Sequence, residues 1–240
     1  MPEIILDAGH GGHDPGAVGN GLKEKDIVLD LALRTGKLLE AREATVKYTR
    51  NTDVFVELSD RARLSNMLKA DLFVSFHVNS SANPASGFES FIYSGVNGGQ
   101  TAAYQNVIHR KVAAVFAAEG VADRGQKKAN LAVLRETNMP AMLIEYGFIN
   151  SPKDVALLKN TAFLDRLAKA TADGISDALG LNKEVVTIQQ ARDWSREAQI
   201  WVKENGISDG TRPKDQVTRE EVWTMLHNFY MKLNQQPRLK

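Results

Sequence analysis

Two histidines and two glutamates stand beside apolar segments that predict strands or helices. His10 follows the first apolar run of the chain within a glycine-rich turn, and His77 ends another such run. Glu145 ends a third run, and Glu24 opens the amphipathic segment after the first turn. Functional groups of an open parallel sheet collect just beyond the carboxyl ends of its strands, so these four side chains are candidates for a single site.

Two imidazoles and a carboxylate are typical ligands of a hydrolytic zinc site. Such a site uses three protein ligands and leaves the fourth tetrahedral position to water, whose pKa the metal lowers toward about 7. A further carboxylate that does not bind the metal then accepts the proton of the water and passes it to a leaving amine. Glu24 and Glu145 could fill the two carboxylate roles in either order, and their spacing alone does not distinguish them.

The other three histidines are interpreted as solvent-exposed rather than functional. His13 lies in a glycine-rich loop, His109 lies beside two basic residues in a helical segment, and His227 falls on the polar side of the last predicted helix. Gly9, Gly11 and Gly12 also raise the possibility of a phosphate-binding loop. That interpretation is rejected because neither the dinucleotide-binding fingerprint nor a Gly-Lys-Ser/Thr ending is present.

The composition excludes several other kinds of chemistry. The chain has 240 residues, a formal net charge of +1 and no cysteine, so it has no thiol nucleophile, iron–sulfur cluster or cysteine-ligated metal site. Basic and acidic side chains are interleaved, so nucleic acid is not an expected partner. No apolar run approaches the length of a membrane-spanning helix, and the first residues lack the features of a secretory signal. No membrane partner is therefore expected. We expect that the protein stays inside the cell, leaves by a route that needs no signal, or has had a leader removed before this numbering.

Strand and helix patterns alternate through the first three-quarters of the chain. Apolar runs predict strands over residues 4–8, 45–50, 72–77, 88–93, 131–134 and 142–144. Helical periodicity predicts helices over residues 24–42, 59–69, 101–118 and 163–179, with Ser59 as a cap and Gly180 as a stop. This alternation predicts an α/β domain with three layers, in which helices flank a central, mostly parallel, twisted sheet.

The sequence pattern changes after residue 181. Residues 1–181 are predicted to form the α/β domain, residues 182–190 a linker, and residues 191–240 a small all-helical module that holds all three tryptophans. Thr218 and Glu221 have the spacing of a capping box at the start of the second helix of this module. Two amphipathic helices bury little surface by themselves, so we expect the module to dock onto the first domain, a second copy or a ligand.

Three sequence motifs resemble those of a known enzyme family. They are DAGHGGHDPGA and GLKEKD at residues 7–17 and 21–26, SFHVN at residues 75–79, and MPAMLIEYGFIN at residues 139–150. In this order, over residues 1 to about 180, they closely resemble the motifs of the zinc-dependent N-acetylmuramoyl-L-alanine amidases of the Amidase_3 type. Asn79 and Glu89 are weaker candidates, and they stay outside the catalytic set.

The resemblance implies roles that spacing leaves open. It implies one zinc ion held by His10, Glu24 and His77, with water as the fourth ligand, and Glu145 as the catalytic carboxylate. It also implies that the substrate is peptidoglycan, cleaved at the amide between N-acetylmuramic acid and L-alanine, which leads to lysis of the wall. Another zinc amidohydrolase or peptidase on the same scaffold is an alternative, as is a non-catalytic wall-binding protein, although the intact His/Glu set argues against the latter.

The C-terminal segment is similar to a single S-layer-homology-type repeat and to short helical tails of some phage lysins. Such modules attach proteins to walls, so our hypothesis is that residues 191–240 bind a cell-wall polymer. A dimerising or stabilising tail is the alternative. The lack of a recognisable signal favours a phage or prophage endolysin, made in the host cytoplasm and acting on the wall after release, over a host autolysin or spore-lysis enzyme. We expect a monomer or a weak dimer.

Overall fold

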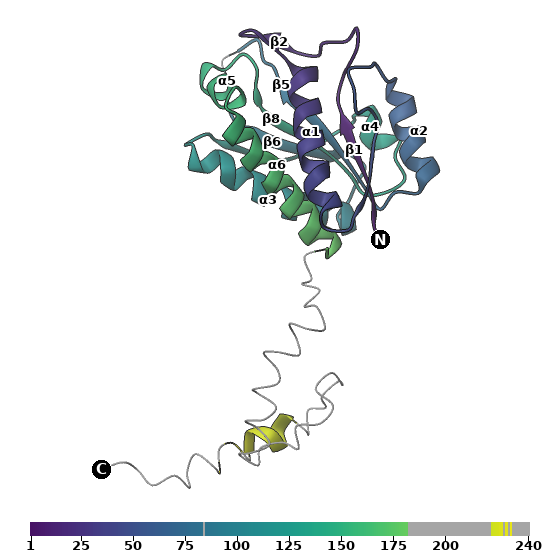
Figure 1. Ribbon diagram of the computed structural model, residues 1–240, viewed down its shortest axis with the longest axis vertical. Helices are drawn as coiled ribbons and strands as arrows, with labels where there is room; N and C mark the ends of the chain where they lie inside the picture. The colour runs from purple at the N-terminus through teal and green to yellow at the C-terminus, as the bar shows by residue number, and fades with distance from the viewer. Residues whose placement is uncertain (84, 182–221, 228, 230, 232–240) are drawn as a thin grey trace, which may run out of the picture. The chain divides into compact units, whose positions relative to one another are not determined.

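The computed structural model describes residues 1–83 and 85–181, together with residues 222–227, 229 and 231. The chain divides into two compact units, Met1–Lys183 and Glu184–Lys240. The first unit contains every labelled strand and helix in Figure 1. The predicted linker at residues 182–190 and the predicted cap at Thr218 and Glu221 lie outside the described residues.

The first unit alternates strands and helices along the chain. Its strands are β1 (Glu3–Ala8), β2 (Val18–Gly19), β3 (Leu22–Lys23), β4 (Thr45–Tyr48), β5 (Leu72–Asn79), β6 (Phe88–Tyr93), β7 (Asp123–Ala129) and β8 (Ala141–Phe148). Its helices are α1 (Glu24–Glu40), α2 (Leu58–Leu68), α3 (Gly99–Ala118), α4 (Ala132–Arg135), α5 (Pro152–Leu158) and α6 (Thr161–Leu179). Six strands form one sheet in the order β4-β1-β5-β8-β6-β7, and β2 and β3 form a separate antiparallel pair.

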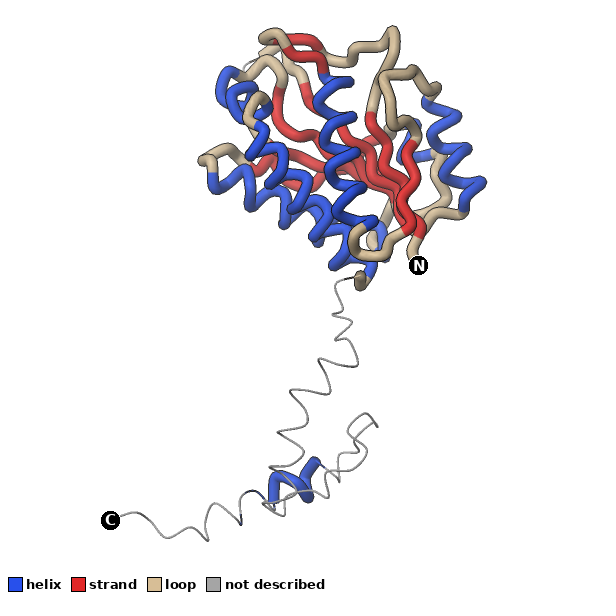
Figure 2. The backbone as a smooth tube through the Cα atoms, viewed as in Figure 1, coloured by secondary structure: helices blue, strands red, loops and turns tan. Residues whose placement is uncertain are grey.

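The expected three-layer α/β architecture is confirmed. All neighbouring strands of the large sheet are parallel except β6 and β8, which are antiparallel. Figure 2 shows the strands between two sets of helices. Successive residues of a strand point to opposite faces, so Ile4 and Leu6 join the core beneath α1, α3 and α6, whereas Ile5 joins a smaller core beneath α2 and α4.

The expectation of a strand over residues 131–134 is wrong. This apolar segment forms the short helix α4, and Val133 and Leu134 are buried in the smaller core. The sixth strand is instead β7, whose sequence Asp-Arg-Gly-Gln-Lys-Lys-Ala has no apolar run. It escapes pattern analysis because it lies at the edge of the sheet, where charged side chains are common and burial is slight.

The predicted cap of the second helix is also wrong. Helix α2 begins at Leu58, one residue before Ser59, and its N-cap residue is Glu57, which makes no side-chain capping hydrogen bond. The sequence analysis does not include helix α5. Two local features mark its start: Ser151 accepts a hydrogen bond from the backbone N–H of Asp154, and a proline stands in the first turn.

The expectation that His109 faces solvent is wrong. This histidine is 2% exposed and lies on the side of α3 that packs against the sheet. Its Nδ1 lies 2.8 Å from Ser90 Oγ, and its Nε2 lies 2.9 Å from Asp123 Oδ1. Burial lowers the pKa of His109, although the charge of Asp123 acts in the opposite direction. The residue is a polar link between α3, β6 and β7. The basic residues beside it in the sequence had favoured an exposed position.

The described part of the second unit contains helical residues 222–227. Val222, Trp223 and Leu226 are exposed there, and so is His227, as expected. Within the described residues of the whole chain, no helix has both the length and the apolar character that crossing a membrane requires.

Candidate active site

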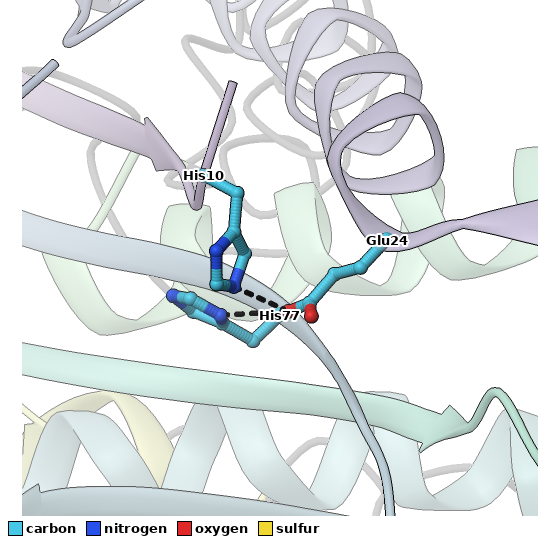
Figure 3. Close-up of side chains that lie close together, drawn as sticks. All are labelled: His10, Glu24 and His77. Atoms are coloured by element: carbon cyan, nitrogen blue, oxygen red, sulfur yellow. Dashed lines mark hydrogen bonds and ion pairs between the residues drawn. The ribbon is translucent and has the colours of Figure 1, made fainter. Parts of the chain in front are cut away.

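The four candidate residues lie at neighbouring positions along one edge of the sheet. His10 follows β1, His77 lies in β5, Glu145 lies in β8, and Glu24 is the first residue of α1. Strands β1, β5 and β8 are adjacent in the sheet, which brings these residues together. Figure 3 shows His10, Glu24 and His77 pointing toward one another, and one donor atom from each lies within 4.8 Å of the others.

The spacing of these three side chains is close enough for one metal ion to contact all of them. Glu24 Oε1 lies 2.8 Å from His77 Nδ1 and 3.2 Å from His10 Nε2. Two ligand atoms that are each about 2.0–2.1 Å from a tetrahedral zinc ion are about 3.3 Å apart. Two imidazoles and one carboxylate are also a donor set used by hydrolytic zinc enzymes. The arrangement is therefore a possible metal site.

Neighbouring groups hold these donors in place. His10 Nδ1 lies 2.7 Å from Asp14 Oδ2, which turns the other ring nitrogen toward Glu24. The backbone N–H of Ala17 donates to Glu24 Oε2 at 2.8 Å, and that of Val78 donates to Glu24 Oε1 at 3.0 Å. Such partners fix the orientation of metal ligands before a metal binds.

Two glycines make room for the three donors. A Cβ atom on Gly9 would lie 2.3 Å from His77 Cε1, and one on Gly16 would lie 2.6 Å from both Glu24 Oε2 and His10 Cδ2. Gly16 also has a φ of 64°, which disfavours residues with a side chain. Any larger residue at either position would displace the donors.

Charge at this site favours a bound cation. Burial would raise the pKa of Glu24, but its hydrogen bonds and charge interactions with His10 and His77 hold that pKa well below its ordinary value. Burial would lower the pKa of His10, but Glu24 and Asp14 outweigh this effect and raise it. Glu24 is therefore a carboxylate at neutral pH, and a positive charge beside it is stabilised.

Glu145 lies beside the three donors on the next strand. Cross-strand register places it opposite His77 on β5 and opposite Glu89 on β6, so the three side chains project from the same face. Among the described residues, Glu145 Oε2 is buried and has no hydrogen-bond partner. Burial raises the pKa of Glu145 well above its ordinary value, and the charges of Glu24 and Glu89 add to this effect. A buried carboxyl group of this kind is typical of a proton-transfer residue.

Two buried arginines, which sequence analysis did not identify, hold the turn that carries His10. Arg61 Nη1 donates to Asp7 Oδ1 and to the carbonyl oxygen of Ala8, both at 2.7 Å, and Arg61 Nη2 donates to the carbonyl oxygen of His10 at 2.8 Å. Arg50 donates to the carbonyl oxygens of Ala8 and Gly9, at 2.9 and 2.8 Å. His10 has a φ of 60°, which few residues other than glycine adopt, so these bonds stabilise an uncommon backbone conformation.

One amide and two cationic side chains surround Glu89. Asn79 Nδ2 donates to Glu89 Oε1 at 2.7 Å, Arg124 Nε donates to Glu89 Oε2 at 2.8 Å, and Lys127 Nζ donates to the same oxygen. The two weaker candidates from the sequence thus bond to each other on the Glu145 side of the site. Burial would raise the pKa of Glu89, but its bonds to Lys127 and Arg124 lower it.

A cavity of about 360 Å³ opens beside His10 and His77. Most of its wall is apolar and comes from residues 55–58, residues 131–133 and Leu143. A larger cavity, of about 520 Å³, lies near Met1, Tyr104 and Leu179, and none of the four candidate residues lines it. The smaller cavity is the one through which a substrate can approach the three donors.

The chain is similar in sequence to known amidases. The sequence model of the Amidase_3 family, described as N-acetylmuramoyl-L-alanine amidase, matches residues 4–177. An endolysin of Bacillus phage SPP1 is 46% identical over 183 residues, which are 75% of this chain and 67% of the relative. The sporulation-specific N-acetylmuramoyl-L-alanine amidase of Bacillus subtilis strain 168 is 45% identical over 185 residues, which are 76% of this chain and 70% of the relative.

The fold is also similar to that of a solved amidase structure. The catalytic domain of CwlV, an N-acetylmuramoyl-L-alanine amidase from Bacillus (Paenibacillus) polymyxa var. colistinus, has a TM-score of 0.71 to this chain at 36% sequence identity. The match covers 76% of this chain and 100% of that domain. Because the sequence model of the family spans most of the chain, this protein belongs to the Amidase_3 family of N-acetylmuramoyl-L-alanine amidases.

Proposed function

We propose that this chain hydrolyses the amide between N-acetylmuramic acid and L-alanine in peptidoglycan. In this proposal His10, Glu24 and His77 hold one zinc ion, and Glu145 transfers the proton. The observation that carries it is the convergence of two imidazoles and a carboxylate, with donor atoms within 4.8 Å of one another, next to a buried carboxylate oxygen that has no partner among the described residues. Membership of the amidase family supports the identity of the substrate.

The mechanism assigns a distinct task to each group. Bound zinc would supply a Lewis acid that polarises the scissile carbonyl group and lowers the pKa of water. Glu145 accepts a proton from the attacking water, whose oxygen bonds to the lactyl carbonyl carbon. The bond from this carbon to nitrogen then breaks, and Glu145 gives the proton to the departing nitrogen of L-alanine. The products are a lactyl carboxylate and a peptide with a free α-amine.

The environment of Glu145 suits this task. Burial together with two neighbouring carboxylates raises the pKa of Glu145 well above its ordinary value, which favours holding the proton between its two transfers. Asp14, Ala17 and Val78 meanwhile hold His10 and Glu24 in fixed orientations. The metal ligands are thereby preorganised, which reduces the cost of arranging them during the reaction.

Digestion of purified peptidoglycan by the full chain tests the reaction. Mass spectrometry should find free stem peptides with an N-terminal alanine, and the Glu145→Gln variant should release them at least about 100-fold more slowly. Released sugars would indicate a glycosidase, and shortened peptides a peptidase on the same scaffold. Either product in place of intact stem peptides would overturn the proposal, and no products at all would favour a non-catalytic wall-binding protein.

Loss of any one metal ligand should remove the metal. We expect His10→Ala, Glu24→Gln and His77→Ala to bind zinc at least about 100-fold more weakly, because even substitutions of outer partners cost about 10–100-fold. Elemental analysis of each purified variant and competition with a chelator measure this loss. His13→Ala is the matched control, because His13 is exposed and lies outside the three donors. A ligand variant that keeps stoichiometric zinc would refute the assignment of that residue.

We also propose that residues 191–240 form a wall-binding module joined to the amidase domain by residues 182–190. The exposed apolar side chains of Val222, Trp223 and Leu226 support a binding role. Deleting residues 183–240 should abolish pull-down by purified walls while sparing hydrolysis of a soluble muropeptide, since the three proposed metal ligands and Glu145 all lie in the other unit. Undiminished pull-down would end this part of the proposal and favour a dimerising or stabilising tail.

A phage or prophage endolysin is the biological role that we propose, with synthesis in the host cytoplasm and action on the wall after release. The endolysin of phage SPP1, at 46% identity, supports it. A role in sporulation is the second candidate, favoured by the relative at 45% identity. Comparing digestion of vegetative walls with digestion of spore cortex separates the two, since an endolysin should prefer vegetative walls. Analytical ultracentrifugation tests our expectation of a monomer or weak dimer.

A further inference from the structure

Two cations meet one buried carboxylate on the Glu145 side of the site. The Glu89 side chain is 5% exposed, and its Oε2 accepts hydrogen bonds from both Arg124 and Lys127. Counted by themselves, Glu89, Arg124 and Lys127 carry one net positive charge. The Arg124 and Lys127 side chains are 35% and 37% exposed, so this excess charge is open to a ligand.

The backbone of β7 is shaped to bring these two cations together. Residues three apart on a regular strand project to opposite faces, so Arg124 and Lys127 would not share a partner without a distortion. The register of β6 and β7 shifts between Phe88 and Ser90, and Gly125 between the two cations has a φ of 89°. Such a bulge redirects a side chain and is common beside active sites.

Arg124 is held in place without using all of its donors. Its guanidinium carbon lies 4.9 Å from the centre of the Phe148 ring, and a Cβ on Gly87 would lie 2.8 Å from its side-chain stem. Only Nε bonds to Glu89, and among the described residues the two Nη atoms have no hydrogen-bond partner. A guanidinium that is held in place and has unused donors is suited to binding a carboxylate.

Both cations contact a carboxylate that stands on the strand next to Glu145. Glu89 stands directly opposite Glu145 on the neighbouring strand, and paired residues of adjacent strands are about 5 Å apart. The second residue of a stem peptide is a glutamate linked through its side chain, so its main-chain carboxylate is free or amidated. The alanine spans about 3.5 Å of extended peptide and the glutamate about as much again. Once the alanine nitrogen is at Glu145, the carboxylate can therefore span the roughly 5 Å between the two strands.

We infer that Arg124 and Lys127 form a subsite that binds the first free carboxylate of the stem peptide, one residue beyond the cleaved amide. This inference rests on the proposed amidase function. The peptide then leaves the metal ligands across β8 and β6 toward β7, and its sugar lies on the side of β1. Amidated peptides lack the charge that the subsite binds, so the enzyme distinguishes acidic from amidated walls.

The test compares two soluble muropeptides that differ only in whether this carboxylate is free or amidated. The zinc-loaded full chain should show about 10-fold higher kcat/KM for the acidic form, the size of a lost charge-assisted hydrogen bond. In Arg124→Ala and Lys127→Ala this ratio should fall toward one. Lys128→Ala is the matched control, because Lys128 neighbours Lys127 on β7 but donates to the carbonyl oxygen of Val96. It should keep the wild-type ratio.

Other outcomes assign the two cations to different tasks. Equal losses on both muropeptides would mean that the cations only support Glu89 and Glu145, and would overturn the inference. Weaker, salt-sensitive wall binding without a change in the ratio would indicate a phosphate-containing wall polymer, and would also overturn it. Calorimetric binding of free stem peptides, acidic and amidated, needs no turnover. It therefore tests the subsite even if the proposed hydrolysis fails, and equal affinities for the two peptides would refute it.

Discussion

Glu145→Gln should abolish hydrolysis and leave the bound metal in place. General acid–base catalysis contributes about 10²–10⁴-fold, and a glutamine can neither accept the proton of water nor return it to the leaving nitrogen. We therefore expect kcat to fall by about that factor. Zinc content should be unchanged, because His10, Glu24 and His77 supply the metal-binding atoms in our assignment.

The structure also predicts that this variant folds normally. Glu145 Oε2 is buried without a partner among the described residues, and a neutral amide removes a charge that burial disfavours. Its melting temperature should therefore equal or exceed that of the wild type. Glu119→Gln is the control, since Glu119 pairs with Arg166 on the surface and should keep full activity. Wild-type turnover in purified Glu145→Gln would refute the assignment of Glu145.

Arg61→Met should cost about 3–5 kcal/mol of unfolding free energy. Arg61 is 2% exposed, and its removal leaves the Asp7 carboxylate buried without its cation, which is the usual magnitude for breaking a buried ion pair. The carbonyl oxygens of Ala8 and His10 lose donors as well. Denaturant unfolding measures the effect. Arg63→Ala is the matched control on the same helix, because Arg63 is 78% exposed and should change stability by less than about 0.5 kcal/mol.

A second substitution and a change of pH separate charge from packing. Asp7→Asn in the Arg61→Met background should recover part of the loss, since no uncompensated charge is then buried. Burial would raise the pKa of Asp7, but Arg61, Ser75 and Thr49 lower it below its ordinary value near 4. The ion pair therefore stabilises the wild type above that pH and is lost as pH falls through the lower folded-state pKa.

The difference in unfolding free energy between wild type and Arg61→Met should accordingly be largest at neutral pH and should become smaller in acid. The variant has a buried Asp7 without its cation, so protonation of Asp7 relieves the variant while it weakens the wild type. Unfolding free energies measured at pH 7 and at about pH 3.5 test this. A difference that stays constant between these two pH values would show that lost packing, rather than lost charge, destabilises the variant.

Strongly patterned elements could be predicted from the sequence because their burial is nearly uniform. The strands β1, β5, β6 and β8 have mostly buried residues, which appear as apolar runs, and α1, α3 and α6 each present one apolar face. The edge strand β7 and the short helix α4 were missed or misassigned. An edge strand needs little apolar surface, and four apolar residues are compatible with either a helix or a strand.

The residue types and their order determined the class of fold, the candidate set of His10, Glu24, His77 and Glu145, and the resemblance to the amidase family. They did so because strands and amphipathic helices have distinct periods, and because groups at the carboxyl ends of parallel strands collect at one edge. Only the tertiary structure decided which strands are neighbours, and hence that Glu145 stands between His77 and Glu89.

Tertiary structure also decided the roles of charged residues far apart in the chain. Arg50 and Arg61 are buried around the His10 turn, and Arg124 and Lys127 meet at Glu89 through a bulge in β7. The local sequence pattern predicts that such side chains are exposed to solvent, because burying a charge without a partner is costly. Their partners lie in segments far away in the sequence, so the local sequence around each charged residue does not reveal them.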